Sequence, residues 1–126
     1  MSLCVRQRYA EPRTSKVCQG MNYDAIRRSL PGCRFSDHAR REMDTEPLGR
    51  IGTEEILAVL DSGEIIEEYR EDIPYPSCLI LGRTQPGRPL HVVCAPVPEE
   101  GQLIIITAYQ PDPTRWEADW RRRKPR

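Results

Sequence analysis

The sequence lacks any hydrophobic run of membrane-spanning length. None of its 126 residues lies in an apolar stretch that approaches the roughly 18 residues of a transmembrane helix. The N-terminus carries arginines, and the apolar segment that defines a secretory signal does not follow them. We therefore expect a cytoplasmic protein that makes no membrane contact.

Closely spaced cysteine pairs are also missing. The five cysteines are an odd number, are widely separated and form no CxxC motif; they are Cys4, Cys18, Cys33, Cys78 and Cys94. This pattern indicates neither a disulfide framework nor a structural zinc site. Cys78 and Cys94 fall within strand-like segments, where a thiol usually acts as a small buried hydrophobe.

The sequence contains no phosphate-binding glycine loop, no nucleophile elbow, no catalytic carboxylate pair and no His/Cys cluster with metal-ligand spacing. Only two histidines are present, His38 and His91. These absences argue against the hydrolase classes that depend on such motifs. We expect neither a metal ion nor a cofactor.

Lysine is scarce, since only Lys16 and Lys124 accompany seventeen arginines among the nineteen basic residues. The net charge is zero, but residues 42–72 are acidic and lie between basic segments. The arginine guanidinium is the better phosphate ligand, so this bias fits contact with nucleic acid. It fits equally well a protein from an arginine-rich, GC-rich genome.

The chain length predicts one domain. Residues 1–20 have no apolar periodicity and are expected to be a poorly ordered extension, so the domain covers residues 21–126 and translation could begin at Met21. Three helices follow. The first is capped by Asn22 and ends at Leu30, the second is capped by Ser36 and continues to Met43, and the third is capped by Thr53 and ends before Gly63.

Beyond Gly63 the spacing of the apolar residues becomes that of β-strands. Strands are expected at 64–69, 77–81, 88–95 and 103–109, and their short connections predict an antiparallel meander. Thr114 and Glu117 have the spacing of a capping box, which predicts a short C-terminal helix containing Trp116 and Trp120. The fold class is α+β, with N-terminal helices packed on a four-stranded, mainly antiparallel sheet.

The last two strands form a hairpin whose register can be predicted. If His91 lies opposite Tyr109, then Val93 faces Thr107. The other face is then wholly apolar and should be covered by the helices, as its residues are Leu90, Val92, Cys94, Ile104, Ile106 and Ala108. We therefore expect His91, Thr107 and Tyr109 on the open side of the sheet.

Several segments together resemble a family of small bacterial proteins, domain of unknown function 4258. The resemblance rests on FSDHARREM (35–43), RIGTEEI (50–56), IIEEYREDIPYPSCLILG (65–82), GRPLHVV (87–93) and IIITAYQPD (104–112). It covers about three quarters of the chain. That family is similar to the RelE-type toxins of bacterial toxin–antitoxin modules, and the resemblance implies a RelE-like fold.

The resemblance also implies a function. RelE-type toxins cleave messenger RNA without a metal, can act on the ribosome, and are neutralised by an antitoxin, which in this family is often a small zinc-finger protein. Such cleavage needs a base for the 2′-hydroxyl proton, an acid for the leaving oxygen, and cations for the phosphate charge. We expect RNA and an antitoxin protein as partners.

Histidine and arginine supply this chemistry best near neutral pH. The expected catalytic residues are His91, Tyr109, His38 and Arg41, and the expected substrate-binding residues are Arg83, Arg88 and Thr107. An arginine beside His91 would lower its pKa.

Each of these residues also has a structural interpretation. His91 can be an ordinary strand residue and Tyr109 an aromatic at the sheet rim, while His38 with Arg41 can brace its helix against Glu67 or Glu68. These two glutamates fit a solvated face, although one could act as a base. The alternative function is a non-enzymatic module of the same fold that binds protein or nucleic acid.

Overall fold

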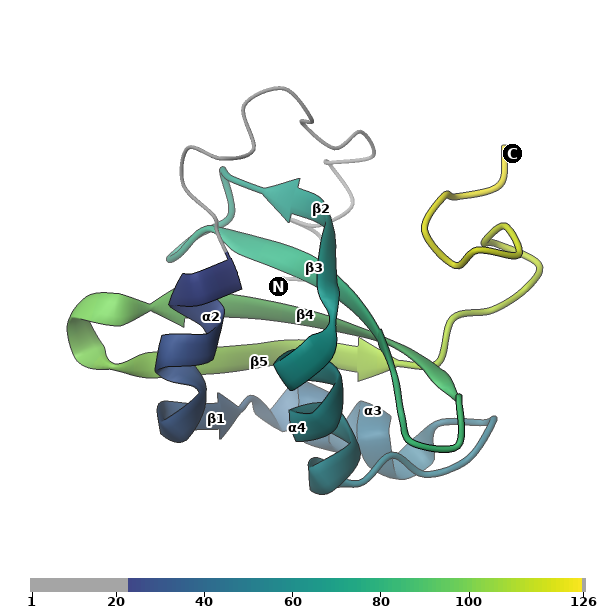
Figure 1. Cartoon of the computed structure of the whole chain (residues 1–126), viewed down its shortest axis with the longest axis horizontal. Coiled ribbons are helices and arrows are strands. Elements are labelled where there is room, and N and C mark those ends of the chain that lie inside the picture. Colours follow the sequence, from purple (N-terminus) through teal and green to yellow (C-terminus); the bar gives the residue numbers. More distant parts are fainter. Residues whose placement is uncertain (1–22, 126) are drawn as a thin grey trace.

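The computed structural model describes residues 23–125, which form an α+β domain (Figure 1). The expectations for residues 1–20, for a start at Met21 and for the Asn22 cap lie outside the described residues. In chain order the elements are α2 (Tyr23–Ser29), η2 (Leu30–Gly32), β1 (Cys33–Phe35), α3 (Asp37–Thr45), α4 (Thr53–Ser62), β2 (Glu64–Tyr69), β3 (Ser77–Arg83), β4 (Pro89–Val97), η3 (Pro98–Glu100) and β5 (Gln102–Tyr109).

The sheet is mixed and has five strands in the order β1-β5-β4-β3-β2. The four expected strands form the predicted antiparallel meander from β2 to β5. The expectation of four strands was wrong, because β1 adds a fifth strand that pairs parallel with β5. A three-residue strand has too few positions to show an alternating pattern, so β1 could not be recognised from its own residues.

The predicted hairpin register is correct for His91 opposite Tyr109 and for Val93 opposite Thr107. Beyond Val93 the register shifts, and Cys94 lies opposite Ile105. This β-bulge inserts one extra residue into β5, so Leu103 and Ile105 face the helices in place of the expected Ile104 and Ile106. The strict alternation of inward and outward side chains along a strand could not predict this bulge.

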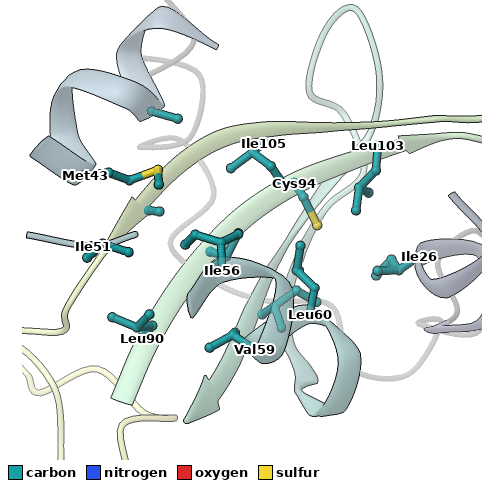
Figure 2. Close-up of a cluster of buried hydrophobic side chains, with 14 of the residues drawn as sticks. Ile26, Met43, Ile51, Ile56, Val59, Leu60, Leu90, Cys94, Leu103 and Ile105 are labelled. Carbon is teal, nitrogen blue, oxygen red and sulfur yellow. The ribbon is translucent and has the colours of Figure 1, made fainter. Parts of the chain in front are cut away.

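One face of the sheet packs against the three helices, as expected. The core contains Ile26 of α2, Met43 of α3 and Ile56 of α4, and Figure 2 shows these side chains converging with residues of the central strands. The strand residues of this cluster are Cys78, Ile80, Leu90, Val92, Cys94, Leu103, Ile105 and Ala108. Burial of this apolar face orients the sheet and thereby fixes which side chains point the other way.

The helix boundaries agree closely with those predicted from the sequence. Ser36 caps α3, since its hydroxyl accepts a hydrogen bond from the Ala39 amide at 3.0 Å. The α4 cap is Gly52, not Thr53 as expected, because the Glu55 carboxylate accepts from the Gly52 amide at 2.9 Å. That contact moves the helix start by one residue.

The expected C-terminal helix is absent, because residues 112–125, here called the C-terminal segment, form turns (yellow in Figure 1). Asp112 accepts from the Thr114 amide and hydroxyl, and the chain reverses at Trp120, whose φ is 62°. Trp116 packs against the second face of the sheet with Tyr69, Leu79 and Val93. The hydrogen bonds between Thr114 and the Asp112 side chain therefore hold a turn where the capping-box spacing predicted a helix.

Candidate functional site

His91 and Tyr109 lie side by side, as the sequence predicted, but their face of the sheet is not open. His91 has no exposed surface, because the C-terminal segment covers it. The His91 Nε2 lies 2.8 Å from the Trp120 carbonyl oxygen, and the Trp116 ring meets the imidazole edge-on with centroids 4.4 Å apart. The expectation of an accessible His91 was therefore wrong.

The hydrogen bonds of His91 define its protonation. A carbonyl oxygen only accepts, so Nε2 carries the proton and donates to Trp120, and Nδ1 accepts from the Tyr109 hydroxyl at 3.2 Å. Burial lowers the pKa of His91 to about 4, the Trp120 carbonyl opposes this change, and the positive charge of Arg123 adds to it. The expected direction is correct, but its main cause is burial. His91 is neutral near pH 7.

A buried ion pair lies beside this histidine. The Arg123 guanidinium donates two hydrogen bonds of 2.8 Å to the Glu67 carboxylate and lies over the Trp116 ring. Glu67 also accepts a hydrogen bond from the Tyr69 hydroxyl. Glu67 is thus neither a solvated side chain nor a partner of His38, in contrast to both interpretations of the sequence.

The two arginines expected to bind substrate occupy different surroundings. Arg83 is exposed and donates to the Gly87 carbonyl at the turn between β3 and β4. Arg88 instead fixes the loop between α3 and α4, since its guanidinium donates to the Gln110 side chain, to the Gly49 and Arg50 carbonyls and to Glu55. With these donors engaged, Arg88 has a structural role in this arrangement.

A second polar cluster lies at the edge of β5. His38 and Glu42 are one helical turn apart on α3, with His38 Nε2 3.6 Å from a Glu42 carboxylate oxygen. The same carboxylate accepts hydrogen bonds from the Thr107 hydroxyl and from the Ala108 amide, the latter at 3.1 Å. The structure thus joins His38 and Thr107 through Glu42. The exposed Arg41 lies on the same helix, three residues after His38.

Helix α3 holds this cluster in place because it continues the edge that β1 begins. After β1 ends, the Ser36 amide donates to the Ile105 carbonyl at 3.0 Å and the Ser36 hydroxyl donates to the Ile106 carbonyl at 3.1 Å. Glu42 then accepts from the Ala108 amide, and Glu46 accepts from the Gln110 amide at 3.2 Å. Side chains of α3 thereby pair with the backbone hydrogen-bonding groups along the outer edge of β5, where no strand is present.

Glu42 was not among the expected site residues, although the helical spacing places it on the same face as His38 and Arg41. It shares a helix face with His38 at a spacing of four, the separation at which a carboxylate reaches an imidazole on the same helix. That spacing could have identified the pair. Its link to Thr107 could not be predicted, because it depends on the β5 bulge and on how α3 docks against the strand edge.

His38 is the more accessible of the two histidines. Its side chain is 36% exposed, and its buried Nε2 lies 3.6 Å from the Glu42 carboxylate without a hydrogen bond in the described residues. Within residues 23–125, no group of three or more His, Cys, Asp or Glu side chains could hold a metal ion. No helix in this part of the chain is long and apolar enough to span a membrane.

These features define a class of small α+β domains with a mixed five-stranded sheet and an imidazole–carboxylate pair at its β1–β5 edge. A family model described as "Domain of unknown function (DUF4258)" matches residues 35–110, so the chain belongs to this family. The match begins at β1, includes both histidines and ends just after β5. No curated protein and no solved structure matches the chain significantly.

Proposed function

We propose that this protein is a RelE-like toxin of a toxin–antitoxin module, an endoribonuclease that cleaves messenger RNA without a metal. The observation that carries the proposal is the His38–Glu42 pair on α3, since it combines a half-exposed imidazole with a carboxylate that can orient it. Arg41, exposed on the same helix, supplies a cation for the phosphate. An antitoxin, such as a small zinc-finger protein, would restrain it.

The geometry supports a division of roles. Because Nε2 faces Glu42, we assign His38 Nδ1 the task of taking the proton of a 2′-hydroxyl and returning it to the leaving oxygen. Glu42 is itself held by Thr107 and Ala108, so its carboxylate is fixed before any ligand arrives. Arg41 would stabilise the charge that develops on the phosphate. His91 is less suited to this role, because both of its ring nitrogens are engaged.

The test is cleavage of total RNA in EDTA by matched variants. We expect His38→Ala to lower the cleavage rate about a hundredfold, which is the usual scale for loss of a general acid or base. Asp44→Asn is the matched control, because Asp44 lies on the same helix and contacts only the exposed Arg50 in the described contacts. Full activity in a folded His38→Ala protein would contradict the proposal. Loss on His91→Gln alone would move the chemistry to the second face.

The second candidate is a non-enzymatic module that binds protein or nucleic acid. The burial of His91 beneath the C-terminal segment favours it, because the strand residue best suited to acid–base chemistry then has a structural role. Expression with and without a neighbouring antitoxin gene would separate the two. Growth arrest with RNA breakage supports a toxin, whereas an inactive protein that still retains RNA or a protein partner supports the module.

A further inference from the structure

The C-terminal segment resembles a bound peptide more than a structural element of the domain. Two arms of a tight turn are joined by backbone hydrogen bonds of 2.8 Å, from the Glu117 amide to the Arg122 carbonyl and from the Lys124 amide to the Arg115 carbonyl. The turn places the Arg123 guanidinium 4.6 Å from the centroid of the Trp116 ring. The segment therefore presents a stacked arginine–tryptophan pair to the sheet.

The sheet surface beneath this pair is complementary to it. The Glu67 carboxylate is only 3% exposed and receives the two-pronged contact from Arg123, while the Tyr69 hydroxyl fixes its orientation. His91 donates to the Trp120 carbonyl and contacts the Trp116 ring. The surface thus offers a buried carboxylate, an imidazole N–H donor and an apolar floor that includes Leu79 and Val93. These groups recognise a planar cation, a carbonyl and an aromatic ring, respectively.

The C-terminal segment buries few of its own side chains against the sheet. Trp116 is its one buried residue among positions 112–125, and the Arg123 side chain remains 47% exposed. Its second ion pair, between Arg121 and Glu64, is also exposed to solvent. The Arg121–Glu64 pair is open to solvent on both sides and exchanges readily with competing charges, whereas the Arg123–Glu67 pair joins a half-exposed guanidinium to a buried carboxylate and is the main polar anchor.

We propose that the surface formed by Glu67, Tyr69, Leu79, His91 and Val93 is a docking site for a segment of a partner protein that presents an arginine stacked on an aromatic ring. The C-terminal segment occupies this site in cis until the partner segment replaces it. This inference does not depend on RNA cleavage, since it rests on the second face of the sheet and not on His38.

The test uses a fluorescein-labelled peptide of residues 112–125 as the probe. Full-length Arg123→Ala protein, whose own segment has lost its anchor, is expected to bind the probe at least tenfold more tightly than wild type does. Arg122→Ala is the matched control, because Arg122 pairs only with Asp119 within the segment and should leave probe binding at the wild-type level. A probe carrying Arg123→Ala should not bind. If folded Arg123→Ala protein fails to bind the intact probe, the docking site is refuted.

A second measurement covers the case in which Arg123→Ala does not fold. The only two tryptophans of the chain, Trp116 and Trp120, both lie in the C-terminal segment, so intrinsic fluorescence reports on its release. Wild-type protein is titrated with a peptide of residues 112–125 in which both tryptophans are phenylalanine, up to about 1 mM, the scale of the local concentration in cis. A saturable red shift of the emission supports displacement. An unchanged emission means that the segment is a fixed part of the fold and overturns the proposal.

Discussion

At the scale of single residues, His91 shows how one buried imidazole couples the sheet to the C-terminal segment. While the ring is neutral, Nε2 donates to the Trp120 carbonyl and Nδ1 accepts from the Tyr109 hydroxyl. Burial adds a further cost to protonation, which is why the pKa falls to about 4. The hydrogen-bonded arrangement therefore depends on pH.

This coupling predicts an acid-sensitive fold. His91 has a pKa of about 4 in the folded protein, and an ordinary histidine has about 6.5, so the unfolded chain binds the proton more readily. The stabilisation is complete above pH 6.5 and is lost as the pH falls toward 4. Between pH 7.5 and 4.5, the free energy of unfolding should fall by about 2 to 3 kcal/mol more in wild type than in His91→Gln. Urea denaturation at both pH values measures this; equal losses would contradict it.

Predictions for single residues were correct where the two-residue alternation of a strand alone decides which way a side chain faces. Strand alternation and hairpin geometry correctly placed His91 beside Tyr109 and away from the helices. The sequence could not predict that the same histidine would be buried, because this depends on a contact with Trp120, 29 residues away in the chain. Arg88 was misassigned for a similar reason, since its partners Gly49 and Glu55 approach only in the folded domain.

At the scale of elements, α3 replaces a strand along half of the β5 edge. Ser36 has two roles there, because its hydroxyl accepts from Ala39 as the helix cap and donates to the Ile106 carbonyl of β5. The structure accounts for the motif FSDHARREM: its serine caps the helix, its histidine is accessible, and its glutamate accepts a hydrogen bond from the edge of β5.

A pair of threonine and serine substitutions tests this arrangement. Ser36→Ala should lower the free energy of unfolding by about 1 to 2 kcal/mol, since it removes a helix cap and a bond to β5. Thr53→Ala should change it by less than about 0.5 kcal/mol, because Gly52 is the cap of α4. Thermal or urea melts of the two variants give the comparison. A larger loss for Thr53→Ala would restore the cap assignment made from sequence.

Elements with strong local determinants were predictable, and the others were not. Capping residues and apolar spacing located α3 and α4 to within about a residue at their starts, and the four long strands were found. β1 was missed because its three residues are defined by pairing with β5 and not by their own pattern. The C-terminal helix was predicted in error because a capping-box spacing does not ensure a helix when Asp112 offers a competing turn.

At the scale of the whole molecule, one sheet separates two apolar clusters. The larger lies beneath the helices and the smaller beneath the C-terminal segment. The candidate site at the β5 edge borders both, since Ala108 belongs to the first cluster while its neighbour Thr107 pairs with Val93 of the second. The site therefore depends on the correct docking of α3 against a completed sheet.

The topology predicts an order of events during folding. The meander from β2 to β5 is built from near neighbours in the chain, whereas β1 must find a strand about 70 residues away. Val92→Ala, in the meander core, should slow refolding about fivefold. Phe35→Leu, in β1, should mainly speed unfolding and leave the refolding rate within about twofold. Stopped-flow refolding and unfolding in urea would measure both, and a slow-refolding Phe35→Leu would place β1 in the folding nucleus.

The parallel pairing of β1 with β5 also has a consequence for biosynthesis. The partners of Cys33–Phe35 are Leu103, Ile104 and Ile105, so the first described strand has no edge to join until residues 102–109 have been translated. Until then α2 and α3 lack most of the apolar surface that they finally cover, and His38 and Glu42 lack Thr107. The candidate site therefore cannot form on a nascent chain that still lacks β5, because Glu42 finds its partners only after that strand has been made.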